Sequence, residues 1–201
     1  MLLFYNHFKH ISIKCGDDCE ISHLRLASCG NENSIILGDG VKLKDVTISI
    51  FGNQNQLIIH SNNNISKVRF VMEDDGNKIE IGKHNFIGSG SLLAALEGTT
   101  ISIGSNCMIA SPCEIRTSDS HSLLDSDERR INYAKDIIIG SHIWIGMGCL
   151  ILKGAYIPED CVVAAKSVVC SMKNVNKGSL LGGTPARILK ENINWNHKRI
   201  K

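Results

Sequence analysis

The sequence of 201 residues lacks most features that would mark a secreted, membrane or nucleic-acid-binding protein. Its net charge is only +2, so no strong electrostatic field favours nucleic acid or acidic membranes. It contains no apolar run of transmembrane length, so we expect no membrane span. The opening sequence MLLFYNHFKH is too short and too polar for a signal peptide, and we therefore expect a cytoplasmic protein.

What the sequence does contain is an aliphatic residue that recurs every six positions. The series is Ile81, Ile87, Ile103, Ile109, Ile115, Ile139, Ile145, Ile151, Ile157, Val163 and Val169. A hexapeptide repeat predicts a parallel β-helix, in which each repeat is one short strand and a turn. Aromatic residues are scarce, at 5% of the chain, which suits the narrow core of such a solenoid.

Eight cysteines suggest a metal site or a disulfide framework until they are placed on the repeat. Four of them occupy the fifth position of a repeat: Cys107, Cys113, Cys149 and Cys161. This position points inward, because side chains two apart in a strand share a face. We therefore expect reduced thiols that pack as small hydrophobic residues. Cys15 and Cys19 have a loose metal-like spacing, but no second pair follows them, so no metal site is predicted.

The repeat divides the chain into three parts and a loop. Residues 1–34 are predicted to be an irregular N-terminal segment, residues 35–170 a parallel β-helix, and residues 171–201 a C-terminal tail. The β-helix is interrupted at about residues 116–136, where polar and charged residues replace the core aliphatics. We interpret this segment as a loop that leaves the coil, and loops held by a rigid scaffold commonly carry function.

Three regions depart from the regular pattern. Leu37 and Leu43 fall outside the six-residue phase of Ile81, which indicates imperfect coils in the N-terminal half. The sequence LEGTT shifts the phase again. Beyond Val169 the repeat is lost, and Pro185 favours a short helical tail from Ala186 onward that would cover the open edge of the last coil.

His121 lies in the middle of the loop, in the sequence SDSHS, among small hydroxyl residues and carboxylates. A histidine, with an unperturbed pKa of about 6.5, suits general-base chemistry near neutral pH. The alternative is an ordinary solvated loop histidine. What distinguishes His121 is its position in the one large break in the repeat.

Trp144 lies between Ile143 and Ile145, both of which point inward, so its own side chain is expected to point outward. A large exposed aromatic side chain usually marks an interface or a stacking surface. Trp144 is therefore predicted to form either a subunit contact or one wall of a ligand cleft.

A basic cluster follows near the C-terminus. Gly182 and Gly183 would allow the backbone to approach a ligand closely. Lys166, Arg187 and Lys190 are suited to phosphate groups, Arg through its bidentate fork and Lys as a point charge. The alternative for this cluster is a set of solvated basic residues.

In chain order these elements are the histidine loop, IGSHIWIG, AAKSVV and TPAR. This order resembles the left-handed β-helix acyltransferases of the hexapeptide-repeat family over roughly residues 35–190. The N-terminal part, with ISIFGNQNQLII, is similar to bacterial O-acetyltransferases of capsule, O-antigen and exopolysaccharide clusters, including those acting on polysialic acid capsules. The resemblance implies an all-β, left-handed parallel β-helix that forms a homotrimer, with acetyl-CoA in a groove between adjacent subunits.

The resemblance also implies catalytic roles for two residues. His121 matches the loop histidine that deprotonates the acceptor hydroxyl, and Trp144 matches the tryptophan that lines the thioester end of the groove. The carboxylate that would orient the histidine is open: Asp119, Asp127 and Glu128 are candidates, and a backbone carbonyl is another.

Cofactor-binding positions carry over in the same way. The coil backbone near Gly146, and at Ala164 and Ala165, would hold the pantetheine arm. Lys166 and Arg187, in the AAKSVV and PAR motifs, would lie near the CoA phosphates. Family members often have Asn or Gly at the position of Lys166, so its phosphate role is inferred from its charge.

The expected function is therefore acetyl-CoA-dependent O-acetylation of a hydroxyl of a bacterial capsular or surface polysaccharide, which can contain sialic acid. Alternatives on the same scaffold are an N-acetyltransferase of a nucleotide amino sugar, a small-molecule O-acetyltransferase, and a non-enzymatic solenoid. A metal-dependent carbonic anhydrase also occurs on this fold. It needs three metal ligands, usually histidines, whereas beyond His121 the coils offer no closely spaced histidine pair.

Overall fold

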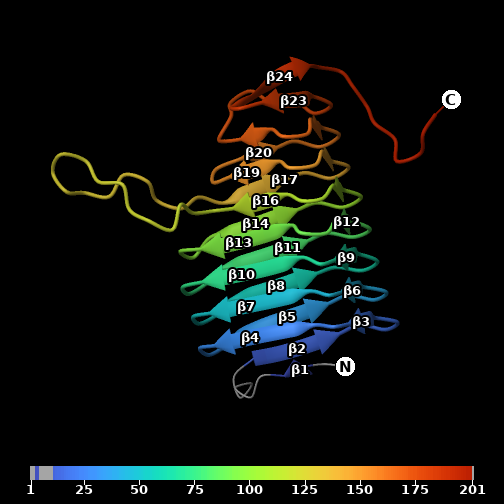
Figure 1. Cartoon of the computed structure of the whole chain (residues 1–201), viewed down its shortest axis with the longest axis vertical. Coiled ribbons are helices and arrows are strands. Elements are labelled where there is room, and N and C mark those ends of the chain that lie inside the picture. The colour runs from blue at the N-terminus through green and yellow to red at the C-terminus, as the bar shows by residue number, and fades with distance from the viewer. Residues whose placement is uncertain (1–2, 5–10, 201) are drawn as a thin grey trace.

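The computed structural model describes residues 3–4 and 11–200, which form a parallel β-helix with three sheets (Figure 1). As far as β23, consecutive strands belong to different sheets, and each parallel strand pairs with the equivalent strand of a neighbouring coil. The predicted fold, an all-β left-handed parallel β-helix of hexapeptide repeats, is confirmed. Across the described residues there is no helix, and hence none that would span a membrane.

Each sheet forms one side of the solenoid. Sheet A contains β1 (Leu3–Phe4), β4 (Arg25–Cys29), β7 (Thr47–Phe51), β10 (Arg69–Glu73), β13 (Leu92–Leu96), β16 (Glu114–Arg116), β19 (Leu150–Leu152) and β22 (Val168–Val169). Sheet B contains β2 (Ile11–Cys15), β5 (Asn33–Leu37), β8 (Gln56–Ile59), β11 (Lys78–Ile81), β14 (Thr100–Ile103), β17 (Ile137–Ile139) and β20 (Tyr156–Ile157). Sheet C contains β3 (Glu20–Ser22), β6 (Lys42–Lys44), β9 (Asn64–Ser66), β12 (Phe86–Ile87), β15 (Met108–Ile109), β18 (Trp144–Ile145), β21 (Val162–Val163), β23 (Leu180–Gly183) and β24 (Ala186–Lys190).

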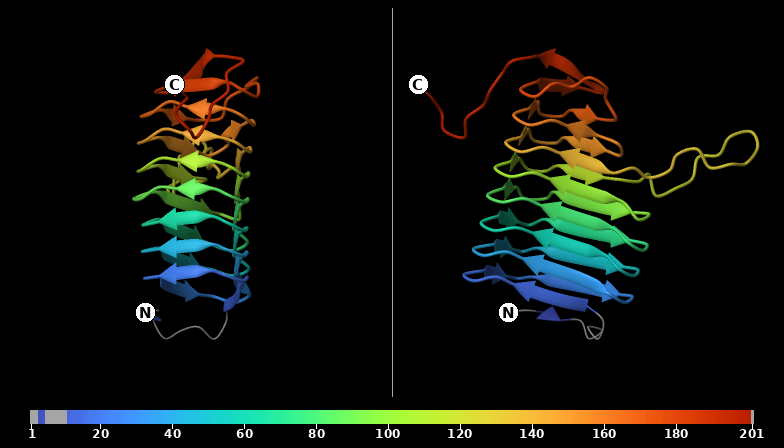
Figure 2. Two further views of the ribbon diagram at one scale, coloured as in Figure 1. Left: turned by 90° about the vertical axis from the view of Figure 1, so that its right-hand side faces the viewer. Right: turned by 180° about the vertical axis from the view of Figure 1, so that it is seen from behind.

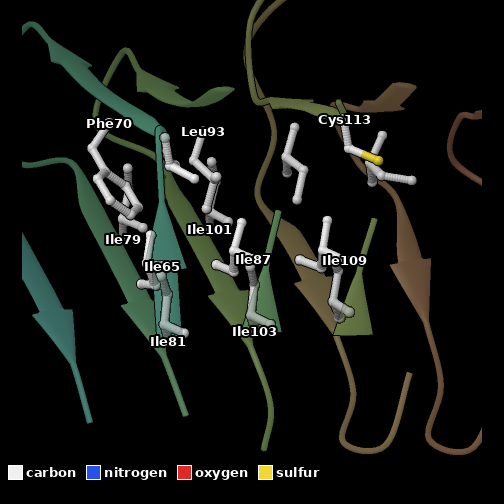
Figure 3. Packing of buried hydrophobic residues seen from close by; sticks show 14 of the residues in the cluster. Ile65, Phe70, Ile79, Ile81, Ile87, Leu93, Ile101, Ile103, Ile109 and Cys113 are labelled. Carbon is white, nitrogen blue, oxygen red and sulfur yellow. The ribbon is translucent and has the colours of Figure 1, made fainter. Parts of the chain in front are cut away.

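The core consists of columns of aliphatic side chains, because in-register parallel pairing places the same inward position of each coil above the last. Ile65, Ile87 and Ile109 are successive partners in sheet C, and Ile81 and Ile103 are partners in sheet B (Figure 3). All five side chains are almost fully buried. Each hexapeptide therefore contributes one such core residue to one side of a coil.

The predicted inward cysteine column is confirmed. Cys107, Cys113, Cys149 and Cys161 are at most 4% exposed and belong to the main hydrophobic cluster. They are free thiols that donate weak hydrogen bonds to backbone carbonyls, such as Cys149 Sγ to Ala164 O at 3.1 Å. They fill the core as small side chains, as their repeat position predicts.

A ladder of buried asparagines lies at the corner between sheets A and B. The Oδ1 atom of Asn33 accepts the N–H of Asn55, and the Oδ1 atom of Asn55 accepts the N–H of Asn77, each at 2.9 Å. The Nδ2 groups donate to carbonyls of the corner, such as Asn55 Nδ2 to Asp74 O at 2.9 Å. All three side chains are at most 1% exposed, and this ladder satisfies the polar groups that the corner buries.

The coils of the N-terminal half are longer than those of the C-terminal half. Asn33 and Asn55, at equivalent positions of successive coils in the N-terminal half, are separated by 22 residues. Cys161 and Ser179 are equivalent in the same way in the C-terminal half and are separated by 18 residues. We refer to the two kinds as wide coils and narrow coils.

The wide coils explain the apparent phase slip at Leu37. Leu37 pairs with Ile59, and Ile59 pairs with Ile81, so the three side chains share one column of the core. The register is therefore continuous along sheet B. A six-residue count loses it because the length of a wide coil is not a multiple of six.

The prediction of an irregular segment at residues 1–34 is wrong for residues 11–34. Strand β2 pairs in register with β5, and β4 pairs in register with β7, so regular coils are already present here. The six-residue phase missed them because these coils belong to the wide type. Residues 1–2 and 5–10, which include most of the segment judged unlike a signal peptide, lie outside the described residues.

The predicted C-terminal helix is also wrong. Residues 186–190 form β24, which turns back and pairs antiparallel with β23. Strand β23 already continues sheet C, so its free edge offers backbone partners that outweigh a local helical preference. The expected cover over the last coil exists, but a strand provides it.

Candidate functional site

The predicted loop is present and leaves the solenoid between β16 and β17 (Figures 1 and 2). It doubles back on itself, with an antiparallel bridge between Leu124 and Arg130. At its tip the Oδ1 atom of Asp125 accepts the N–H groups of Asp127 and Arg129, each at 2.9 Å. The loop is therefore an ordered hairpin-like arm whose shape depends on local side-chain hydrogen bonds.

An ion pair fastens the arm to the wide coils. The guanidinium of Arg130 donates two hydrogen bonds to the Glu97 carboxylate, at 2.6 and 2.8 Å, and the Ser118 hydroxyl donates a third at 2.5 Å. The hydrogen bonds from Arg130, and then from Ser118, lower the pKa of Glu97 from 4.5 to about 2. A bidentate, partly shielded pair of this kind fixes geometry more strongly than an exposed one.

A second set of contacts fastens the arm to the narrow coils. Lys153 donates to the Asp119 carboxylate and, at 2.8 Å, to the carbonyl of Asn132. The buried amide of Asn132 bridges the two strands of the arm, donating to Asp119 Oδ2 at 2.7 Å and to His121 O at 2.8 Å. The hydrogen bond from Lys153, followed by that from Asn132, lowers the pKa of Asp119.

His121 is consequently held by its backbone while its imidazole is exposed to solvent. Among the described residues no side chain forms a hydrogen bond with this imidazole. Two of the candidate orienting carboxylates are engaged elsewhere: Asp119 by Lys153 and Asn132, and Asp127 by Arg129 at 3.2 Å. Within the described part of a single chain, the orientation of the His121 ring is therefore not fixed by a hydrogen bond.

Trp144 points outward, as predicted, and is 39% exposed. It forms one wall of a groove of about 600 Å³ on the outer face of sheet C and the corner that leads to sheet A. The groove is almost wholly apolar, and its lining also includes Gly146, Ala164 and Ala165. The structure thus brings together four of the residues predicted to bind the acyl donor.

Small side chains are needed in this groove for packing as well as for access. A Cβ atom on Gly146 would lie 2.6 Å from the backbone N of Ala165, which belongs to the next coil. Glycine therefore allows these coils to stack at this corner. The same choice leaves a smooth, shallow surface against which an extended chain can lie.

Lys166 and Arg187 lie near the C-terminal end of this groove. Lys166 follows Ala165 at the corner, and the Thr184 hydroxyl contacts the Lys166 carbonyl at 3.5 Å, so the TPAR turn covers the same corner. Both basic side chains are exposed, and no described carboxylate lies within ion-pair distance of either. Their positive charges are thus available to an anionic ligand.

His121 and the groove lie on different edges of the solenoid. The loop joins sheet A to sheet B, whereas the groove is formed by β18, β21 and β23 of sheet C. The loop projects from the side of the molecule opposite the C-terminal tail, which runs beside sheet C (Figures 1 and 2). No residue of the described loop lines the groove, so one chain does not assemble the predicted catalytic and donor-binding residues.

The sequence did not predict a cluster at the corner between sheets B and C. His142 Nδ1 lies 2.8 Å from Asp160 Oδ1, and its ring stacks on Trp195 with a centroid distance of 4.6 Å. Trp195 Nε1 donates to His142 O at 2.8 Å, and its ring lies 6.1 Å from that of Trp144. The available signal was the second of two tryptophans, placed in the polar C-terminal tail.

Comparison with curated proteins finds partial relatives. No protein-family model matches the chain. Over 91 residues, 45% of the chain, it is 38% identical to a polysialic acid O-acetyltransferase of Escherichia coli O1:K1 / APEC, and covers 29% of that protein. The chain spans less than half the length of the curated relatives that it matches.

Solved structures match over more of the chain. The polySia-specific acetyltransferase NeuO superposes with a TM-score of 0.65 and 30% identity, over 87% of this chain and 83% of that one. A hexapeptide-repeat-containing acetyltransferase of Vibrio cholerae superposes with a TM-score of 0.53 and 33% identity, over 67% of this chain and 73% of that one.

Proposed function

The chain belongs to the hexapeptide-repeat acetyltransferase family, and from this we propose that it transfers an acetyl group from acetyl-CoA to a hydroxyl of a bacterial capsular or surface polysaccharide. The observation that carries the proposal is the apolar groove beside Trp144, which gathers the predicted donor-binding residues. The relatives named for polysialic acid favour an acceptor that contains sialic acid. Location in the cytoplasm stays a prediction from the sequence.

The groove has the chemistry that acetyl-CoA requires. Its apolar floor at Gly146, Ala164 and Ala165 suits the pantetheine arm, and Trp144 would flank the thioester. The positive charges of Lys166 and Arg187 would receive the phosphates. When bound, acetyl-CoA supplies the activated acyl group.

We further propose that a homotrimer completes the site, with the loop of one subunit reaching the groove of its neighbour. The separation of His121 from the groove within one chain supports this arrangement. The arm also exposes four large apolar side chains, each at least 55% accessible: Leu123, Leu124, Ile131 and Tyr133. An exposed apolar patch of this kind is typical of a surface that a protein partner covers.

In the proposed reaction His121 acts as general base. It would accept the proton of the acceptor hydroxyl as that oxygen attacks the thioester carbonyl, and would then pass the proton to the departing thiolate. A backbone N–H of the coil would stabilise the charge on the carbonyl oxygen, an effect of about 3–4 kcal/mol per donor in other acyl transfers. Direct transfer, with no covalent acyl-enzyme, is consistent with the burial of the core thiols, each of which is at most 4% exposed.

Replacement of the base tests this mechanism. We expect His121→Ala to lower kcat by roughly 100-fold to 10,000-fold, the usual contribution of a general base, while acetyl-CoA still stabilises the protein against heat. The matched control is His23→Ala, because His23 is an exposed histidine that pairs with Asp45 on the N-terminal coils. Turnover should be measured with acetyl-CoA and a panel of capsular oligosaccharides.

The outcomes separate the levels of the proposal. Wild-type turnover in His121→Ala would remove this residue from the mechanism without affecting the assignment of an acetyltransferase. Failure of acetyl-CoA to stabilise the wild-type protein would remove the donor. Transfer to amines but not to hydroxyls would contradict O-acetylation.

A further inference from the structure

We call the groove lined by Trp144, Gly146, Ala164 and Ala165 the donor groove. A second cavity, of about 440 Å³, lies beside it and extends toward the N-terminus. It follows the corner between sheets B and C and the adjoining outer face of sheet C. We call it the corner groove, with the lining residues Asn62, His84, Phe86, Asn106, His142 and Trp195. Phe86, Met108 and Trp144 are successive partners in sheet C, so the two grooves share one continuous outer face.

Polar side chains line one edge of the corner groove in a column. Asn62, His84, Asn106 and His142 occupy the same corner of four coils, with φ angles between 56° and 61°. The coils are stacked about 4.8 Å apart, so three steps of the column span roughly 14 Å. The turn alone does not require these side chains, because Gly40 takes the same corner in another coil with a φ of 63°.

Aromatic side chains also line the corner groove, from sheet C and from the C-terminal tail. Phe86 is 43% exposed on the outer face of sheet C. Trp195 comes from the C-terminal tail and is fixed against His142 by ring stacking and by its indole hydrogen bond. Because these contacts fix Trp195, its ring presents a preformed flat surface against which the face of a ligand can pack.

The polar lining of the corner groove carries no negative charge. Its polar lining consists of amides and imidazoles, among which the amides of Asn62 and Asn106 have N–H groups to donate, and no carboxylate of the described residues belongs to it. Asp160, which lies nearby, is engaged by His142 at 2.8 Å. A ligand that carries hydroxyl or carboxylate oxygens on one face and C–H groups on the other would satisfy both sides.

We propose that the corner groove binds the acidic acceptor glycan, along sugar residues that precede the one that reacts beside Trp144. Sugar rings present C–H faces to aromatic side chains, and their hydroxyl and carboxylate oxygens accept from amide and imidazole donors. This inference rests on the proposed transferase function and adds the place where the glycan chain is held. It makes acceptor length a determinant of affinity.

Chain-length dependence of the Michaelis constant tests the inference. With polysialic acid as the probe, we expect Phe86→Ala to raise the KM for long chains about tenfold, equivalent to about 1.4 kcal/mol, with little change for short oligomers or for acetyl-CoA. Phe51→Ala is the matched control, because Phe51 is 42% exposed on sheet A, away from either groove. Equal KM values for long chains in the two variants would overturn the inference and leave the transferase function intact.

Direct binding gives a readout that does not depend on turnover. We expect long polysialic acid to bind the wild-type protein, and to bind Trp195→Ala and Phe86→Ala about tenfold more weakly than Phe51→Ala by calorimetry. Dextran serves as the neutral control and should not bind. Wild-type affinity in both variants, or no binding of polysialic acid to the wild type, would overturn the inference. Loss of the oligomer in Phe86→Ala with unchanged glycan affinity would do so as well, because this face would then be a subunit contact.

Discussion

The wide N-terminal coils and the narrow C-terminal coils are two versions of one architecture. In the wide coils equivalent residues are separated by 22 residues, and the corner between sheets A and B buries a ladder of asparagines. Strands of sheet A have five residues there, such as β7 and β10. In the narrow coils equivalent residues are separated by 18 residues, and the sheet A strands β19 and β22 are shorter. In the wide coils, buried polar side chains form hydrogen bonds within the solenoid. In the narrow coils, small side chains face outward and line the donor groove.

The loop stands where these two regions meet, and it is fastened to both. Glu97 belongs to the last wide coil and Lys153 to a narrow one, and each binds a residue of the arm. We infer that the wide coils make the solenoid rigid and that the narrow coils form the binding surface. Three substitutions test it, each with a partner in the other region or at the loop tip.

The largest effect is expected from the asparagine ladder. Asn55→Ala would leave the buried N–H of Asn77 without an acceptor and create a cavity, at a combined cost of about 2–4 kcal/mol. Cys149→Ala, at an equally buried position of the narrow coils, removes only one thiol and should cost about 1 kcal/mol. Urea unfolding measures both. Equal losses would show that the ladder contributes no more than ordinary core packing.

An intermediate effect is expected in the groove. Gly146→Ala would place a Cβ atom 2.6 Å from Ala165 N, and we expect a loss of about 1–3 kcal/mol together with a raised acetyl-CoA KM. In the wide coils, Gly76→Ala meets no neighbouring atom and has only the strain of a φ of +72°, about 1–2 kcal/mol. It should leave the KM unchanged. A raised KM in Gly76→Ala would contradict the assignment of binding to the narrow coils.

The smallest change in global stability is expected at the loop. Glu97→Gln would weaken the pair with Arg130 and let the arm open locally, so kcat should fall roughly tenfold while the free energy of unfolding changes by less than about 1 kcal/mol. Limited proteolysis of residues 118–136 and steady-state kinetics measure this. Asp127→Asn is the control, because the pair between Asp127 and Arg129 at the loop tip is exposed and contributes little.

The pH dependence of this pair has a definite sign. A lowered carboxyl pKa contributes stability that is fully present above the unfolded value of 4.5 and is lost as the pH falls through about 2. Protection of the wild-type arm from proteolysis should therefore persist at mildly acidic pH and disappear only toward pH 2. Loss of protection near pH 4.5 would show that Arg130 does not hold Glu97 ionised.

The sequence predicted what depends on local spacing. The inward cysteines and the outward Trp144 follow from the six-residue repeat, because side-chain alternation along a strand is a local rule. The register of Leu37 was not predictable from a hexapeptide, because the wide-coil spacing of 22 is not a multiple of six. The C-terminal helix failed because the open edge of β23 is a feature of the assembled sheet and not of the local sequence.

Contacts between residues far apart in the sequence could not be predicted from the six-residue repeat. Glu97 and Arg130 are 33 residues apart, and Trp195 and His142 are 53 apart, so no periodicity connects them. The phase shift at LEGTT did mark the position of Glu97, although it gave no reason to expect an ion pair. The corner groove likewise depends on a tail whose path the sequence does not constrain.

The asparagine ladder has a consequence for how such a chain changes over evolutionary time. The same hydrogen bond, from a backbone N–H to the Oδ1 of the preceding asparagine, joins successive rungs, so removal of residues 55–76 would set Asn77 directly above Asn33 and restore this bond. Whole coils can thus be lost or duplicated without disturbing the donor groove several coils away. Insertion or deletion of whole coils would therefore change the length of the solenoid in fixed steps. The same events would lengthen or shorten the face along which the acceptor glycan lies.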